Sequence, residues 1–196
     1  MTTNNDLYIS EMTGKLKMIP ALNTNPLGNR FCLEKSKIER SICQKCYSVK
    51  SCKGFRASAV PTWQRNSDLL KDLIPLNELP LVNSVFFRFN AHGELINSQH
   101  FINLCNIAKK NPRTTFALWT KRSQIVQKNL QHVPKNLILI YSRSKIDCRD
   151  KRIPKGFHKV FNVVSRGEHN CGARSCWTCA KCYNFNKSVV ITEKVK

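Results

Sequence analysis

The stretch Asn136-Leu-Ile-Leu-Ile-Tyr141 decides the fold class of this chain. Its four consecutive aliphatic residues lack the polar alternation of a strand that has one face in water, so we expect both faces to be buried. Such strands are typical of parallel sheets that are covered by helices. The stretch therefore predicts a buried central strand in an α/β protein.

The same pattern of strand and helix recurs on either side of this stretch. Apolar runs of strand length are found at 15–22, 84–89, 114–119, 159–164 and 188–192. Helical patterns are found at 57–74, 98–110 and 123–132. Pro112 and Pro134 follow the last two helices, as expected for residues that cannot continue a helix.

Alternating strands and helices predict βα units. We therefore expect a mostly parallel sheet flanked by helices, in the form of a partial βα barrel. A chain of 196 residues suits a single domain over 1–196. The core of this domain is expected to span residues 15–183 and to include cysteine-rich metal-binding loops at 32–52 and 171–182. Residues 1–12 are expected to be a flexible lead-in.

Polar residues cluster where the predicted strands end. Ligands of parallel α/β folds bind at the carboxyl ends of the strands. The candidate ligand-binding residues at these ends are Arg88, Asn90, Glu94, Lys121 and Ser142, with Trp119 beside them. Both cysteine-rich loops also follow strands, so we expect the loops and these side chains to share one edge of the sheet. No two residues form a recognisable acid–base or nucleophile–base pair, so no catalytic residue is predicted.

The C-terminal cysteine set lies in Cys171-Gly-Ala-Arg-Ser-Cys176-Trp-Thr-Cys179-Ala-Lys-Cys182. Zinc sites usually use two separated C-x2-C pairs, whereas the denser C-x2-C-x2-C run is typical of iron–sulfur proteins. The spacing favours a 4Fe-4S cluster. Zinc is the alternative metal, and a disulfide or free-thiol arrangement stays open.

The N-terminal cysteine set consists of Cys32, Cys43 and Cys46. Three thiolates on a 4Fe-4S cluster would leave one iron free for a substrate or cofactor. Cys52 is either a fourth ligand or a free thiol. The sequence does not decide whether the two sets hold one cluster or two.

The remaining cysteines and histidines have simpler interpretations. Cys105 lies on the apolar side of a predicted helix and is expected in the core. Cys148 lies in a charged loop and is not expected to be a ligand. No histidine has zinc-finger spacing to the cysteines, and His100, His132 and His158 are expected at the surface.

The charge of the chain favours anionic partners. Lys and Arg total 33 against 12 Asp and Glu, a net charge of +21. Such a surplus favours nucleic acid through counterion release, although a solvated basic surface has the same composition. The chain has no run of 18 apolar residues, and because Met1 to Asp6 is polar with no apolar region behind it, we expect no signal peptide. We therefore expect no membrane partner and a cytoplasmic location, where thiols stay reduced.

The motifs together resemble the phage gene product 88 family, small cysteine-rich proteins of phages and prophages. The matching pieces are Cys32, Cys43-Gln-Lys-Cys46-Tyr-Ser48, Arg65-Asn66, Phe87-Arg-Phe-Asn-Ala-His-Gly-Glu94, Leu118-Trp-Thr-Lys121, Leu139-Ile-Tyr-Ser142 and Cys176 to Tyr183. The resemblance implies a phage-encoded protein in the cytoplasm of the host cell. A host protein is then a further candidate partner; the oligomeric state is not implied.

A more distant resemblance is to radical S-adenosylmethionine enzymes, which carry a three-cysteine loop followed by a Gly-Gly-Glu-like turn. Here Cys32, Cys43 and Cys46 precede His92-Gly-Glu94 in that order. The resemblance implies that Glu94 holds the amino group of S-adenosylmethionine. The spacing departs from the usual C-x3-C-x2-C, since this chain has C-x10-C-x2-C. A plain turn between strand and helix explains His92-Gly-Glu94 equally well.

Three functions therefore stand side by side, the last of which is a regulatory protein that binds a host partner through a cluster-dependent surface. The first is an iron–sulfur protein, either a redox enzyme or a minimal radical enzyme, with both cysteine sets as ligands. The second is a basic nucleic-acid-binding protein in which the cysteine-bound metal is structural. Metal analysis separates the first function from its zinc alternative, and salt-dependent binding tests the second.

Overall fold

A computed structural model describes residues 6–149 and 151–195. Within these ranges, seven strands form one sheet in which each strand pairs with the next along the chain. The strands are β1 (Ile9–Ser10), β2 (Ala21–Leu22), β3 (Phe86–Phe89), β4 (Thr115–Thr120), β5 (Leu137–Ser142), β6 (Lys159–Val164) and β7 (Val190–Lys194). Only β1 and β2 are antiparallel. The predicted mostly parallel sheet is thus confirmed, whereas β1 and β7 remain its two edges in these ranges and no closed barrel is seen.

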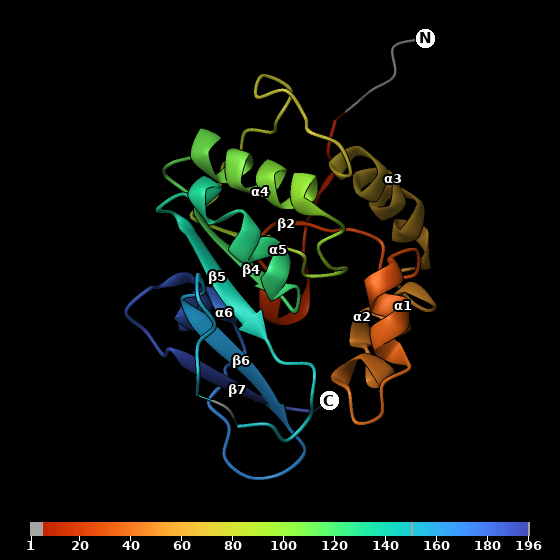
Figure 1. Cartoon of the computed structure of the whole chain (residues 1–196), viewed down its shortest axis with the longest axis vertical. Helices are drawn as coiled ribbons and strands as arrows, with labels where there is room; N and C mark the ends of the chain where they lie inside the picture. The colour runs from red at the N-terminus through yellow and green to blue at the C-terminus, as the bar shows by residue number, and fades with distance from the viewer. Residues whose placement is uncertain (1–5, 150, 196) are drawn as a thin grey trace.

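Two helices cover one face of the sheet, α4 (Ser98–Lys110) and α5 (Ser123–Lys128), the latter followed by the 3-10 turn η4 (Leu130–His132) (Figure 1). Asn97 begins α4, because its Oδ1 accepts a hydrogen bond from the backbone N–H of His100 at 2.9 Å. The buried strand residues on this face are Phe87, Phe89, Phe116, Leu118, Leu137 and Leu139. Side chains alternate along a strand, so their neighbours point to the opposite face, which we call the inner face.

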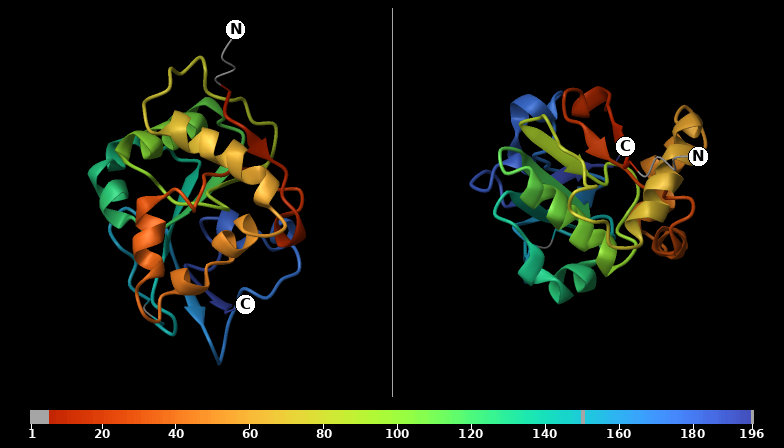
Figure 2. Two further views of the ribbon diagram at one scale, coloured as in Figure 1. Left: turned by 90° about the vertical axis from the view of Figure 1, so that its right-hand side faces the viewer. Right: turned by 90° about the horizontal axis from the view of Figure 1, so that it is seen from above.

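The inner face is covered by segments from both ends of the chain. These are η1 (Gly14–Leu16), the short helix α6 (Cys176–Cys179) and η5 (Lys181–Tyr183). Seen from above, α6 lies on the side of the sheet away from α4 and α5 (Figure 2, right). The side chains buried here are Ile19, Ala117, Ile138, Ile140 and Tyr183, with Phe86, Trp119, Phe161 and Trp177 packed against them.

Five short elements lie beside the sheet, near β1 and β2 (Figure 1). They are α1 (Arg30–Ser36), η2 (Ile42–Lys45), α2 (Tyr47–Cys52), η3 (Ala57–Ala59) and α3 (Val60–Leu70). The buried Asn66 attaches α3 to the sheet: its Oδ1 accepts from Tyr8 N, and its Nδ2 donates to the carbonyls of Tyr8 and Asn23, each at 2.9 Å. One amide side chain therefore connects α3 to β1 and to the segment after β2.

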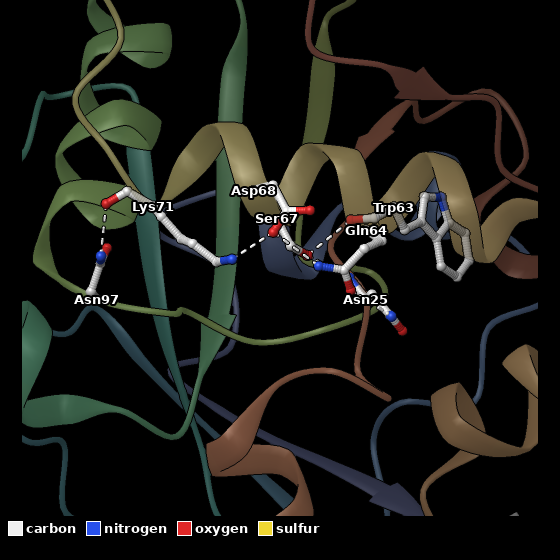
Figure 3. Close-up of polar contacts among 7 residues, drawn as sticks. All are labelled: Asn25, Trp63, Gln64, Ser67, Asp68, Lys71 and Asn97. Atoms are coloured by element: carbon white, nitrogen blue, oxygen red, sulfur yellow. Dashed lines mark hydrogen bonds and ion pairs between the residues drawn. The ribbon is translucent and has the colours of Figure 1, made fainter.

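A second row of polar contacts runs along α3 (Figure 3). The Ser67 hydroxyl donates to the carbonyl of Trp63 at 2.8 Å and accepts from Asn25 N at 2.9 Å. At the end of the helix, the Asn97 amide donates to the Lys71 carbonyl at 2.7 Å. The same asparagine therefore begins α4 and holds the end of α3.

The structure departs from the sequence predictions in the first third of the chain. Residues 15–22 were expected to be a strand, but positive φ angles at Gly14 and Met18 interrupt the extended backbone and leave only the two-residue β2. The expected flexible lead-in contains β1, and its residues 1–5 lie outside the described ranges. Helices α1 and α2 were not predicted, because neither has a periodic apolar pattern.

Two further differences concern burial. The helix expected at 57–74 ends at Leu70, and Leu73, which follows it, is 59% exposed. His100 was expected at the surface but is fully buried on the side of α4 that faces the sheet. No helix in the described parts of the chain is long and apolar enough to cross a bilayer.

Candidate functional site

The loop 90–94 forms the centre of the candidate site, at the carboxyl end of β3. Asn90 and Gly93 have positive φ angles of 52° and 88°. A Cβ on Gly93 would lie 2.1 Å from Thr24 Oγ1 and 2.5 Å from the Thr24 carbonyl oxygen, so only glycine fits. Thr24 N also donates to the His92 carbonyl at 3.2 Å. The loop is thereby fixed against the segment that follows β2.

Glu94 connects the ends of β3 and β4. Its Oε1 accepts from Leu95 N at 2.8 Å and from the Thr120 hydroxyl at 2.6 Å, and its Oε2 accepts from Lys121 N at 2.9 Å. A carboxylate has about four acceptor sites, and these donors take three of them. Glu94 therefore braces the loop and keeps one acceptor site on Oε2 for a further donor.

Two more contacts continue the site across the inner face. Lys121 Nζ donates to Ser142 Oγ at 3.1 Å, which links the ends of β4 and β5. The Arg88 guanidinium lies over the Trp119 ring, 3.1 Å from its centroid. Of the residues predicted from the strand ends, Lys121 thus contacts Glu94 through its backbone N–H and Ser142 through its side chain. Arg88 lies within β3, before the strand end.

Asn90 is the residue of the loop with unmet hydrogen-bonding capacity. It is 5% exposed, and neither its Oδ1 nor its Nδ2 has a partner within the described part of the chain. Buried amides are normally hydrogen-bonded, since an unpaired one costs free energy. Arg88 Nε, on β3, likewise has no hydrogen-bond partner within the described part of the chain. These groups suit a polar ligand that offers both a donor and an acceptor.

The N-terminal cysteine set lies next to the loop 90–94. Asn29 caps α1 by accepting from Cys32 N at 3.3 Å, and its amide donates to the Glu94 carbonyl at 3.0 Å. Cys32 is therefore anchored close to Glu94. Cys43 lies in η2, and Cys46 immediately precedes α2.

The pKa of Cys32 depends on its burial and on charged and thiol groups of the candidate site. Burial raises the pKa of the Cys32 thiol well above its usual range, and the Glu94 carboxylate and the Cys46 and Cys43 thiols raise it further. The Lys121 cation opposes this effect. All three thiols thus lie close enough to interact electrostatically, beside a carboxylate and an ammonium group from the strand ends.

Helix α2 is attached to the same loop by residues that were not predicted as site residues. The Tyr47 hydroxyl donates to the Ala91 carbonyl, and Ser48 Oγ lies 2.9 Å from His92 Nδ1. His92 stacks on Trp63 with ring centroids 4.5 Å apart, and burial lowers its pKa to about 4. The signal for these roles was slight: Tyr47 and Ser48 directly follow the C-x2-C pair, and His92 precedes Gly93.

The C-terminal cysteine set surrounds α6. Ser175 caps this helix through a hydrogen bond from Thr178 N at 3.4 Å, and Ala180 ends it in the left-handed conformation with φ 49°. Cys176 and Cys182 pack against the inner face. The loop that carries Cys171 is attached to β7, since Cys171 N donates to the carbonyl of Thr192 at 2.9 Å.

These four thiols interact with one another. Burial raises the pKa of Cys182 to about 12, the Arg88 cation opposes this, and Cys171, Cys176 and Cys179 raise it further. Burial likewise raises the pKa of Cys171 and Cys176. Arg88 is therefore the nearby positive charge on the sheet that favours the thiolate forms of Cys176 and Cys182.

The two sets do not share one edge as the sequence predicted. The N-terminal set lies at the carboxyl edge beside Glu94, whereas the C-terminal set lies against the inner face, because the chain after β6 crosses beneath the sheet before β7 begins. Among residues 6–149 and 151–195, no three His, Cys, Asp or Glu side chains are arranged closely enough to hold one metal ion. All ten cysteines are free thiols.

The cysteines outside the two sets differ in their surroundings. Cys105, on α4, is fully buried in the hydrophobic core, as predicted, and burial raises its pKa to about 12. Cys52 is 3% exposed, and after burial the Cys46 thiol contributes most to its raised pKa. Cys52 therefore lies close enough to Cys46 for the two thiols to interact electrostatically. Cys148 is half-buried in the loop after β5.

A cavity of about 180 Å³ lies beside this site, between α1, α3 and the start of α5. Its polar wall includes Asn25, Gln64 and Ser67, whose contacts are drawn in Figure 3. The cationic side chains Arg30, Lys71 and Arg122 also line it. Arg30 and Lys71 are already paired with Glu34 and Asp68.

Fold and site together define a strongly basic α/β protein with two groups of free thiols on a mostly parallel sheet. A family comparison agrees with the motifs: the model of Gene product 88 matches residues 5–192. The chain belongs to the Gene product 88 family, a family of phage proteins. No curated protein and no solved structure matches the chain significantly.

Proposed function

We propose that this protein binds 4Fe-4S clusters through its two cysteine sets and acts in redox or radical chemistry. The observation that carries the proposal is the grouping of seven thiols into two interacting sets, each beside a cation from the sheet. We further propose that the sheet is part of a βα barrel. The sequential order of its parallel strands supports this arrangement.

The chemistry of the donors fits such a group. Thiolates are ligands for iron–sulfur clusters and for zinc, and the C-x2-C-x2-C run of Cys176, Cys179 and Cys182 is denser than the paired knuckles usual for zinc. Cys171, Cys176 and Cys182 are neutral thiols at pH 7, since burial raises their pKa values. Metal binding releases these protons, so loading is expected to weaken at low pH.

The polar side chains at the carboxyl edge supply the binding site for a small molecule beside the N-terminal set. Glu94 keeps an acceptor site for an ammonium group, and Lys121 offers a cation to a carboxylate. An amino acid moiety presents both groups, so S-adenosylmethionine is the ligand that the proposal names. A bound cluster would supply electrons for its reduction; the residues of this chain bind and orient it.

Anaerobic purification followed by counts of iron, sulfide and zinc tests the cluster assignment. We expect iron and sulfide in equal amounts and a broad absorbance band near ~400 nm. The variants Cys32→Ser/Cys43→Ser and Cys176→Ser/Cys182→Ser should each lose iron, whereas Cys105→Ala/Cys148→Ser, which also removes two thiols, should keep it. Colourless protein that contains only zinc would instead support the structural-metal alternative, in which the basic surface binds nucleic acid.

Binding of S-adenosylmethionine to loaded protein tests the ligand assignment. Glu94→Gln should weaken binding at least tenfold, because the amide has no negative charge for the amino group. Ser142→Ala, which removes the hydroxyl that contacts Lys121, should weaken binding of S-adenosylmethionine less. Negligible binding by the loaded wild type would end this part of the proposal and leave the cluster assignment intact.

A further inference from the structure

Residues 30–56, which we call the basic segment, form a strongly cationic part of the chain beside the sheet. The segment contains eight Lys or Arg and two Glu, a surplus of six positive charges in 27 residues. Arg30 pairs with Glu34 at 2.8 Å, and this neutral pair leaves the surplus of six positive charges unchanged. The exposed cations that remain are Lys37, Arg40, Lys45, Lys50 and Lys53. Helices α1 and α2, which belong to this segment, face the viewer together in the left panel of Figure 2.

The basic segment also presents an aromatic ring to solvent. Phe55, three residues after the end of α2, is 81% exposed, more than any other large hydrophobic side chain in the described ranges. The Arg56 guanidinium lies 5.4 Å from its ring centroid. Tyr47, at the other end of α2, is 56% exposed although its hydroxyl is bound to the loop 90–94. An apolar ring held among cations is costly in water and suits a planar, anionic partner.

We propose that the basic segment binds single-stranded nucleic acid, with phosphates on Lys50 and Lys53 and a base stacked on Phe55. Cationic tracks with interspersed aromatic rings are the common feature of proteins that bind single strands. Stacking on Phe55 requires a base that is not already paired within a duplex. The exposed ring therefore favours single strands over duplex, and the charge of the whole chain accelerates the encounter.

The distribution of apolar residues disfavours a membrane surface as the partner. A helix that lies on a bilayer needs a continuous apolar stripe. On α1 the exposed Leu33 lies between Arg30 and Lys37, one turn away on either side. The apolar side chains of the segment are thus separated by charges, as on a surface that follows a phosphate backbone.

Fluorescence anisotropy with a labelled oligothymidylate of about 20 nucleotides tests the proposal on the full chain, since this length exceeds the site of one binding surface. Phe55→Ala should weaken binding about tenfold, and Lys50→Gln/Lys53→Gln should weaken it and make the salt dependence shallower by about 0.7 per lost contact. Matched controls on the exposed surfaces of other elements are Leu81→Ala and Lys109→Gln/Lys128→Gln. These controls should bind like the wild type.

Three outcomes would overturn the proposal. They are equal losses in the variants and their controls, tighter binding to a duplex of the same length, and binding to anionic phosphatidylserine vesicles without binding to the oligonucleotide. The segment also carries Cys32, Cys43 and Cys46, so wild type, variants and controls are compared at the same measured metal content. Iron and sulfide counts decide the proposed cluster, whereas the oligonucleotide titration decides this surface.

Discussion

Arg88 and Trp119 form a stacked cation–π pair on the inner face, with the guanidinium 3.1 Å from the ring centroid. A partly exposed pair of this kind contributes about 1 kcal/mol. Trp119→Ala should therefore lower the free energy of unfolding by at least about 1 kcal/mol, because Arg88 loses its only stacking partner within the described ranges. Trp119→Phe keeps an aromatic face and should cost less than Trp119→Ala. Urea unfolding of both variants measures the difference; equal losses would contradict a specific role for the stack.

Glu94 provides the second prediction. Its carboxylate accepts three hydrogen bonds, and hydrogen bonds to charged groups contribute about 1.5–3 kcal/mol each. Glu94→Ala leaves the Thr120 hydroxyl and Lys121 N without this partner, so we expect a loss of at least about 3 kcal/mol in unfolding free energy. Glu94→Gln keeps one acceptor oxygen and should lose less. An unchanged unfolding midpoint for Glu94→Ala would mean that Glu94 serves a ligand alone.

Gly93 provides the third prediction. Gly93→Ala places a methyl group on backbone atoms of Thr24 at a φ of 88°, so the loop must move. We expect a loss of more than about 3 kcal/mol, in the range of strained, overpacked positions. Gly14→Ala is the matched control: it has a similar φ of 62° but open space around it, and it should cost only about 1 kcal/mol. Similar losses for both would show that the backbone conformation, not the contact with Thr24, governs this position.

His100 provides a prediction for pH. Its Nδ1 accepts from Ile96 N at 3.2 Å, and burial, assisted by the Arg122 cation, lowers its pKa to about 3. In the unfolded chain the pKa is about 6.5, so between these values only the unfolded chain binds the proton. The stability from neutral His100 is therefore fully present above about pH 6.5 and falls as the pH decreases, by up to about 1.4 kcal/mol per pH unit. Buried His92 adds to the same slope.

Urea unfolding between pH 7 and pH 4 measures this slope. His100→Gln should make it shallower, since the glutamine oxygen can accept a hydrogen bond without titrating. His169→Gln, at an exposed histidine, should leave the slope of the wild type. A wild-type stability that stays constant from pH 7 to pH 4 would contradict the assignment.

The strands and the strand-end residues were predictable because their signals are local. Continuous apolar runs mark the buried strands of a parallel sheet, and polar residues directly after them must lie at the carboxyl edge. Lys121 and Ser142 were found in this way, and the 3.1 Å contact between their side chains follows from the pairing of β4 with β5. The core position of Cys105 was predictable from helical periodicity alone.

The missed features depend on tertiary packing. Helices α1 and α2 are held in place by contacts such as those of Asn29 with Glu94 and of Ser48 with His92. No sequence pattern predicts these contacts. The burial of His100 depends on the tertiary contacts of α4, which bury more than one side of the helix, Asn103 and Ile107 included. The position of the C-terminal cysteine set depends on the face across which the chain returns between β6 and β7, and loop composition does not specify this choice.

The covering of the inner face by η1 and α6 has a consequence for synthesis on the ribosome. Strands β3 to β5 can pair, and α4 and α5 can pack against them, as soon as about residue 142 has left the ribosome. Their inner face, with Ala117, Ile138 and Ile140, has only Leu16 and Ile19 to cover it until Tyr183 emerges. The order of the elements therefore produces a nascent intermediate with one finished face and one incompletely covered apolar face. The cysteine segment that completes the sheet also protects this face from aggregation.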